Sequence, residues 1–342
     1  MHSRPLHLLL AITLLLASCH QSDRPILLNG EAQGTYYNIA YFDPQQRNLQ
    51  QQVDSLLHAF DQIASLWVEN STIRQINSHS DSLVGPIFLD ILNKSNEIEA
   101  YTNGAFNCRI GPLVNLYGFG FKNRTDVTDS QVDSLLAILR ANGPAVADTH
   151  AGSANGILRL PPGVELDFNA IAQGYSVDLI AHLFDSLGLT SYLINVGGEV
   201  IAHGAKPDGS SWKVGIERPA ADKYSSQEIE TAIALNDCSV VTSGSYRKYY
   251  EQDGLRYSHT IDPATGRPVS HNLLSASVVS RQSWYADAMA TAFMVMGLDN
   301  ALQFIESHPD NPDIQAAFFI YDDHGTYKTY ATPQFQQLIN KD

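Results

Sequence analysis

Two residues near the C-terminus have the chemistry and the spacing of metal ligands. Asp287 and Thr291 stand four positions apart in the segment ADAMAT. The apolar run over 284–296, which Gly297 follows, predicts a helix, and this spacing places the carboxylate and the hydroxyl on one helix face. Mg²⁺ takes oxygen ligands and keeps room for phosphate oxygens of a substrate, so the pair is typical of a metal site completed by a nucleotide. Such a pair also occurs by chance on solvated helices, so other segments must decide.

Five further segments carry recognisable patterns, and they occur in a fixed order along the chain. They are 103–120 (NGAFNCRIGPLVNLYGFG), 166–178 (LDFNAIAQGYSVD), 194–199 (INVGGE), 241–246 (VTSGSY) and 258–269 (SHTIDPATGRPV). Together with ADAMAT, this set resembles the ApbE family, the FAD:protein FMN transferases. The resemblance covers nearly all of the chain from about residue 30 onward and is more specific than a single glycine-rich motif.

The resemblance implies a phosphoryl transfer. FMN would pass from FAD to a Ser or Thr hydroxyl of an acceptor protein, for which a subunit of a membrane redox complex is one candidate, and AMP would leave. Such reactions depend mainly on positioning and on neutralising phosphate charge. By resemblance, Mg²⁺ would be held by Asp287, Thr291 and the backbone carbonyl of Ala170, while His259 would contact phosphate or help to deprotonate the hydroxyl. Asp287 and His259 are therefore the catalytic candidates.

The resemblance also assigns residues to the binding of FAD. They are Gln33, Trp67, Ala105, Phe106, Asn107, Asp167, Gln173 and, again, His259. Several depart from the family pattern, since Gln173 stands where Lys is usual and Asn107 where Asp is usual. Trp67 stands where a flavin-stacking aromatic, often Tyr, is expected. Its alternative role is core packing at the end of a helical stripe, and the sequence favours neither.

Two other functions share this pattern. The same site could hydrolyse FAD to FMN and AMP with water in place of the acceptor, or the chain could be a non-catalytic flavin-carrying lipoprotein. The metal pair disfavours the latter. An aromatic side chain at position 67 should hold FAD firmly, which favours transfer over hydrolysis.

The N-terminus predicts export. Arg4 precedes an apolar run over 6–16 that is too short to span a bilayer, and the small residues of LASC at 16–19 match a lipobox. We expect a signal peptide at 1–18, an acylated Cys19, a polar tether over 19–29 and a single flavin transferase domain over 30–342. The protein would be anchored by lipid to a bacterial membrane and face the periplasm. The alternative is an ordinary signal peptide with a chance cysteine.

The composition excludes some partners. The formal net charge of −15 argues against nucleic-acid binding through a basic surface. It also disfavours long-range attraction of an anionic dinucleotide, so metal, backbone amides and cations such as Arg109, Arg247 or Arg267 would have to compensate locally. Cys108 and Cys238 would either pair or remain free thiols.

The periodicity predicts an α+β fold with mainly antiparallel sheets packed with helices, because no repeating βαβ rhythm appears. We expect helices over 49–67, 87–101 and 173–187, and one that starts at Thr128, where Gln131 completes a capping box. Strands are expected over 35–42, 192–196, 212–217 and 229–235. Hairpins are expected to turn at 253–254 and 324–325, and 219–228 to form a surface loop.

Overall fold

The computed structural model describes residues 24–78, 82–120, 127–149, 153–219, 228–245, 249–252 and 255–339. Of the strands at 249–252 and 255–258 it describes the backbone alone. Among all these residues no helix is both long enough and apolar enough to cross a membrane.

An eight-stranded sheet forms the centre of the fold, and all its neighbouring strands pair antiparallel. Its order is β1 (Ile26–Ala32), β2 (Thr35–Tyr41), β6 (Tyr192–Val196), β7 (Glu199–His203), β10 (Cys238–Gly244), β15 (Leu273–Ser280), β16 (Ala316–Asp323) and β17 (Thr326–Ala331). The expected α+β class with mainly antiparallel strands is confirmed.

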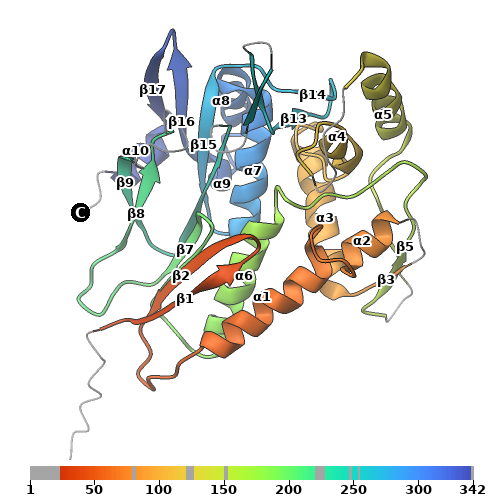
Figure 1. The fold of residues 1–342 in the computed structure, drawn as a ribbon. Coiled ribbons are helices and arrows are strands. Elements are labelled where there is room, and N and C mark those ends of the chain that lie inside the picture. The colour runs from red at the N-terminus through yellow and green to blue at the C-terminus, as the bar shows by residue number, and fades with distance from the viewer. Residues whose placement is uncertain are drawn as a thin grey trace, which may run out of the picture.

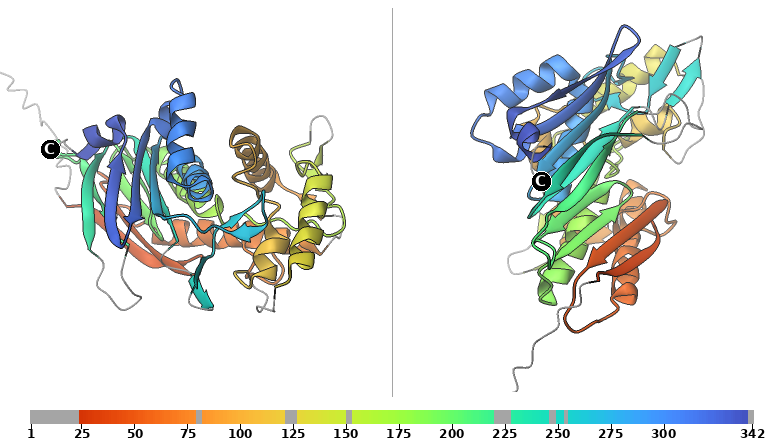
Figure 2. Two further views of the ribbon diagram at one scale, coloured as in Figure 1. Left: turned by 90° about the horizontal axis from the view of Figure 1, so that it is seen from above. Right: turned by 90° about the vertical axis from the view of Figure 1, so that its left-hand side faces the viewer.

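Two helices cover one face of this sheet, α6 (Ala172–Ser186) and α7 (Ser283–Met296) (Figures 1 and 2). Ten of the fourteen residues of α7 are buried. Further helices lie beyond α6 and α7. They are α1 (Gln50–Ala64), α2 (Thr72–Asn77), α3 (Pro86–Tyr101), α4 (Gly111–Leu116) and α5 (Asp129–Ala141). The metal-site candidates on α7 therefore lie inside the molecule, between the sheet and these helices.

The opposite face of the sheet is covered by a hairpin and a short helix. β8 (Trp212–Glu217) and β9 (Ile229–Leu235) pair as a separate two-stranded sheet, and α10 (Pro333–Ile339) packs beside them. Trp212, Ile216 and Phe335 share one apolar cluster with the outward-facing side chains of β7, β10 and β16. The middle strands of the central sheet are thus covered on both faces, while the edge strands β1 and β17 are largely exposed.

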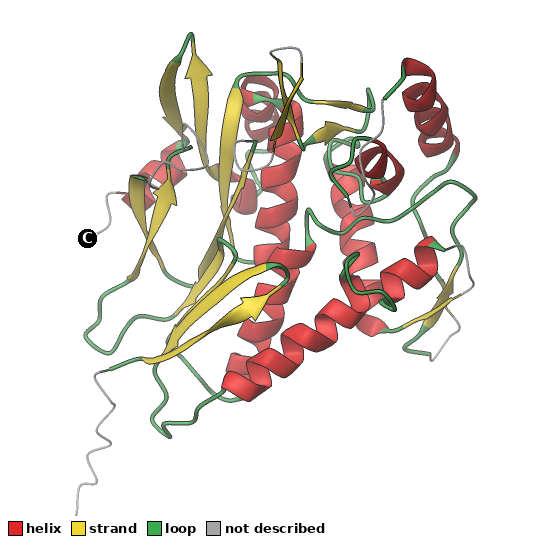
Figure 3. Cartoon of the chain, viewed as in Figure 1, coloured by secondary structure: helices red, strands yellow, loops and turns green. Residues whose placement is uncertain are grey.

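The remaining elements are short. β3 (Ser82–Val84), β5 (Gly156–Leu158) and β4 (Asp148–Thr149) form a small sheet, and β13 (Ile261–Asp262) pairs with β14 (Arg267–Pro268) beside α4 and α5 (Figure 3). β11 (Tyr249–Gln252) pairs with β12 (Leu255–Ser258), as the expected hairpin requires, although 253–254 lie outside the described residues. The short helices α8 (Leu298–Ser307) and α9 (Pro312–Gln315) precede β16.

Most expected elements are confirmed, with two instructive differences. The capping box of Thr128 and Gln131 is present, and β6, β8 and β9 have the expected bounds. The helix expected over 49–67 ends at Ala64, so Trp67 lies beyond it. Residues 26–29, expected to be tether, are part of β1, because they pair with β2 in register. The folded domain therefore begins before residue 30.

Candidate active site

The site is built where α6 and α7 approach each other. Gly174 is buried on the first turn of α6, and its backbone N–H donates to Oδ2 of Asp287 at 3.0 Å. A Cβ on Gly174 would lie 2.4 Å from the carbonyl oxygen of Ser283 and 2.8 Å from Cβ of Asp287. Only glycine permits this approach, which fixes the carboxylate against the start of α6.

Asp287 sits in an environment that opposes its ionisation. Burial raises its pKa to about 7; the Gly174 hydrogen bond acts in the opposite direction, and the nearby charge of Asp178 raises it further. Asp178 is itself buried and accepts hydrogen bonds from the backbone N–H groups of Ser283 and Trp284 at the start of α7. A buried carboxylate with a like charge nearby is stabilised by a cation.

Thr291 is the single residue between Ala286 and Met294 of α7 that is not buried. Its hydroxyl lies 3.1 Å from the hydroxyl of Ser243 on β10. The predicted i, i+4 face of Asp287 and Thr291 therefore exists, and it faces β10 and α6. Among the described residues no group of three or more His, Cys, Asp or Glu side chains could hold a metal ion. A metal here would depend on hydroxyl, carbonyl and substrate oxygens beside one carboxylate.

A cavity of about 550 Å³ opens beside this crossing. Three of the predicted FAD ligands, Gln33, Trp67 and Gln173, line it together with Asp61 and other residues of the α1 end, the β1–β2 turn and the loop before α6. Gln173 precedes Gly174, so the residue that holds Asp287 and the residue that lines the cavity are neighbours in sequence. The structure brings four predicted residues, Gln33, Trp67, Gln173 and Asp287, into one region.

Trp67 presents its ring to solvent at the cavity. Its side chain is 60% exposed, and its backbone N–H donates to the hydroxyl of Ser65 just after α1 ends. The core-packing alternative is therefore wrong for Trp67. An exposed indole beside a cavity is suited to stacking on a planar ring.

Gln33 and Gln173 are held in place by hydrogen bonds. Gln33 adopts a left-handed backbone conformation (φ 55°) in the β1–β2 turn, and its Oε1 accepts from the hydroxyl of Ser176 at 3.3 Å. Its Nε2 is buried without a hydrogen-bond partner among the described residues. Nε2 of Gln173 donates to the carbonyl of Val196 at 2.9 Å. The buried Nε2 of Gln33 is a donor that a ligand could satisfy.

The segment 105–107 and Asp167 belong to the scaffold of the site rather than to its open surface. Phe106 is buried, and Asn107 donates to Glu99 and accepts from the backbone N–H of Arg109. Asp167 donates its backbone N–H to the carbonyl of Cys108, and burial raises the pKa of its carboxyl. Neither these residues nor the half-buried Ala105 line the cavity, and their contact with FAD stays a prediction.

Ala170 lies in the turn before α6, half-buried against the core. It stands four residues before Gly174, so its carbonyl occupies the place that would accept the Gly174 N–H in a continuous helix. That N–H reaches Asp287. Gly174 thus connects the two predicted metal ligands, because it stands four residues after Ala170 and its N–H donates to Asp287.

His259 is half-buried, and its ring packs edge-on against Phe119 with centroids 6.4 Å apart. It is not among the residues that line the cavity, and its predicted role stays untested. Arg109 is buried in an ion pair with Glu99, and Arg267 forms an exposed pair with Asp129; neither lines the cavity, and Arg247 lies outside the described residues.

The sequence reasoning missed several residues of the site. Asp61 and Asn169 line the cavity, Asp178 supports the start of α7, and Ser243 reaches Thr291. Asn169 and Ser243 stand inside two of the segments that carry the family resemblance, 166–178 and 241–246. Their place in those segments is the signal that could have identified them as site residues. Cys108 and Cys238 do not form a disulfide with each other, and Cys19 lies outside the described residues.

Comparison with known proteins defines the class. Residues 33–318 match the model of the ApbE family, and the chain belongs to that family. It is 34% identical to a FAD:protein FMN transferase of Vibrio cholerae over 97% of this chain and 98% of the relative. It is 30% identical to one of Escherichia coli K12 over 97% of this chain and 96% of the relative.

Solved structures agree with the sequence relatives. The apo flavinyl transferase ApbE of Pseudomonas stutzeri superposes with a TM-score of 0.78 at 30% identity, covering 93% of this chain and 98% of that one. The flavin transferase ApbE of Vibrio cholerae gives 0.78 at 32% identity over 92% and 99%. The fold is therefore that of flavin transferases.

Proposed function

We propose that the protein transfers FMN from FAD to a Ser or Thr hydroxyl of an acceptor protein. The hydroxyl oxygen forms a bond to the FMN-side phosphorus, the bond from that phosphorus to the AMP oxygen breaks, and the hydroxyl proton is lost. AMP leaves. The observation that carries the proposal is the junction at Gln173 and Gly174, which joins a cavity of about 550 Å³ to a buried carboxylate. The names of the relatives agree with it.

The residues present fit Mg²⁺. Asp287, Thr291 and the carbonyl of Ala170 are oxygen donors of the kind that Mg²⁺ prefers, and a cation would favour the ionised form of Asp287, whose pKa burial raises. When bound, the metal would neutralise pyrophosphate charge. A ligand set with one carboxylate leaves positions for phosphate oxygens and water.

The chain's own side chains position the substrate. The exposed face of Trp67 stacks on a ring of FAD, and Gln33 lines the same cavity with an Nε2 donor that has no hydrogen-bond partner among the described residues. His259, which stands in the segment 258–269, accepts the proton from the acceptor hydroxyl or contacts the phosphate. A positioned hydroxyl has an effective-concentration advantage over water, which favours transfer over hydrolysis.

The test uses purified protein with FAD, Mg²⁺ and a folded acceptor domain. AMP release is followed by chromatography, and covalent flavin by in-gel fluorescence. We expect slow AMP release without acceptor, and release that rises in step with labelling when the acceptor is added. Rapid release of FMN and AMP with no labelled acceptor would assign the protein as a hydrolase instead.

We also propose that the protein is exported and anchored by lipid on Cys19, on the strength of the lipobox. Replacing the sulfur removes the acylation site, so Cys19→Ser should leave the protein unacylated and released from membranes. Membrane fractionation with mass spectrometry of the N-terminal peptide checks this. A Cys19→Ser protein that stays in the membrane fraction with its lipid would contradict it.

A further inference from the structure

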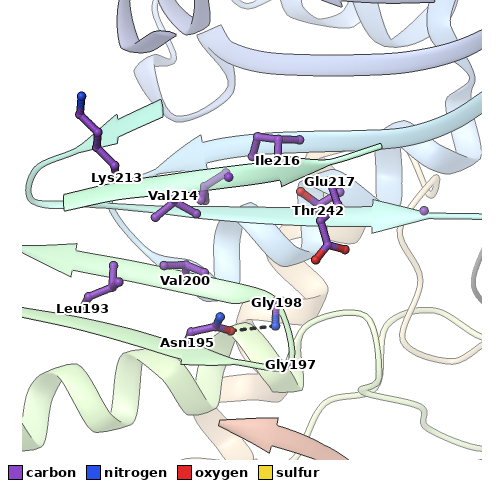
Figure 4. A pocket seen from close by; sticks show the side chains of 13 residues that line it. Leu193, Asn195, Gly197, Gly198, Val200, Lys213, Val214, Ile216, Glu217 and Thr242 are labelled. Carbon is purple, nitrogen blue, oxygen red and sulfur yellow. Dashed lines mark hydrogen bonds between the residues drawn. The ribbon is translucent and has the colours of Figure 1, made fainter. Parts of the chain in front are cut away.

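A second cavity lies on the other face of the central sheet. It measures about 310 Å³ and lies between β8 and strands β6, β7 and β10 (Figure 4). We call it the edge groove. On the side of the main sheet it is lined by Leu193 and Asn195 of β6, Val200 of β7, the turn residues Gly197 and Gly198, and Val240, Thr242 and Gly244 of β10; on the side of β8 it is lined by residues 213–217.

The two walls of the edge groove differ in kind. The β10 residues are alternate positions, so they present one face of a strand. The β8 residues are five in a row, and since consecutive side chains point in opposite directions, what they share is the backbone edge. In the part of the chain that the structure describes, β8 pairs with β9 alone. The groove therefore contains an unpaired strand edge.

An unpaired edge carries a row of backbone donors and acceptors that an extended peptide can pair with. Residues 213–217 would pair with a segment about 17 Å long, from about 3.4 Å per residue. The charged lining residues stand at the two ends, Lys213 at one and Glu217 at the other. The fitting occupant is an extended segment with an acidic side chain at the Lys213 end.

One end of the edge groove adjoins the candidate active site. The Gly197–Gly198 turn lines the groove, and a Cβ on Gly197 would lie 1.7 Å from Nε2 of Gln173, which lines the FAD cavity. Thr242 lines the groove, while the next residue, Ser243, faces Thr291 through the sheet. Only the Gly197–Gly198 turn and the end of β10, at the margin of the central sheet, thus lie between the two cavities in this region.

We propose that the edge groove binds the acceptor protein, whose extended segment adds to β8 and brings its hydroxyl residue over the Gly197–Gly198 margin to the FAD site. This rests on the proposed function, because it supplies the second substrate of that reaction. Glycines at the margin leave room for a backbone to pass close by. FAD and acceptor would then approach from opposite faces of the sheet.

Hydrogen exchange of the whole protein, loaded with FAD and Mg²⁺, tests the site. The probe is an acceptor domain whose target hydroxyl residue is replaced by Ala, so that it binds without turnover. We expect slower exchange of amides within 213–217. If the native acceptor is labelled with flavin but the slowed amides lie outside 213–217, the proposal for the edge groove is wrong, whereas the proposed FMN transfer still holds. If nothing is labelled and nothing is protected, both fail. Protection that depends on the concentration of the protein alone would assign the edge to a second copy and overturn the proposal.

A charge reversal gives an independent readout. Lys213→Glu should raise the KM for the acceptor by about tenfold without lowering kcat, because a like charge opposes docking. The matched control is Lys206→Glu, which makes the same charge change on a lysine that lies over the ring of Trp212 and does not line the groove. An unchanged KM in Lys213→Glu, or an equal rise in both variants, would contradict the proposal.

Discussion

The two halves of the candidate active site are built in opposite ways. At the α6–α7 crossing, Asp287 is buried, fixed by Gly174 and unable to ionise easily. At the rim of the cavity, Trp67 lies beyond the end of α1 and is 60% exposed. The difference separates two tasks. Charge stabilisation needs a dry and rigid place, whereas recognition of a planar ligand needs an accessible surface.

Removing the buried charge should have the largest effect. Asp287→Asn keeps an oxygen that accepts the Gly174 N–H but loses the charge that a metal requires, so FMN transfer should fall by about 10²–10³-fold. In-gel flavin fluorescence of an acceptor measures it. The melting temperature should not fall, since a buried charge is removed rather than added. Full activity in this variant would place the metal elsewhere.

Removing the aromatic ring of Trp67 should have a smaller effect, and the effect should fall on FAD affinity. Trp67→Asn removes a stacking surface, and stacking on an aromatic side chain is worth about 1–3 kcal/mol. We expect FAD to bind about 5–150-fold more weakly, with a larger share of free FMN among the products. Trp67→Tyr is the control, because it keeps a π face. Equal affinities in all three proteins would show that the ring does not contact FAD.

The sequence predicted these two halves unequally, for physical reasons. The helix of Asp287 followed from an uninterrupted apolar run closed by Gly297, whose positive φ ends α7. Trp67 could not be placed, since periodicity does not reveal that α1 stops at Ala64, three residues earlier. The role of Gly174 was also hidden. It depends on how closely two helices approach, and that distance is set by tertiary packing.

The order of strands was hidden for a similar reason. β10 lies between β7 and β15, and β1 was not expected as a strand. Pairing partners far apart in the chain leave no local pattern. The residue beside Asp287 that raises its pKa, Asp178, stands on another helix and could not be inferred from spacing.

The buried half should also respond to pH in a characteristic way. The pKa of Asp287 is raised from 3.8 to about 7 by burial, and that of Asp178 to about 6. The unfolded chain therefore loses these protons first, so the metal-free protein should lose stability as pH rises from about 4 to 7. Asp287→Asn should flatten this fall. Calorimetric melting across the range measures it, and an identical profile in the variant would contradict the assignment.

Mg²⁺ should reverse that trend because it binds the ionised carboxylate. The gain in melting temperature on adding Mg²⁺ should be larger at about pH 8 than at about pH 5, and absent in Asp287→Asn. Ca²⁺ as a second cation separates site binding from general salt effects. A gain that is equal at both pH values would mean that Asp287 is not a ligand.

The smallest effect is expected where the two halves join, at Gln173. The family usually has Lys at this position, and a charge there would attract the pyrophosphate in a protein whose net charge is −15. Gln173→Lys should therefore raise FAD affinity at low salt, but by less than about fivefold, since exposed charges contribute about 0.2–1 kcal/mol. The substitution also removes the hydrogen bond to the carbonyl of Val196, which is the last residue of β6 before the Gly197–Gly198 turn.

Fluorescence titration at low and high salt separates the two contributions, because only the charge is screened. Gln173→Met is the control that loses the hydrogen bond without gaining charge. Weaker binding in both variants would mean that the tie to Val196 matters more than the missing charge.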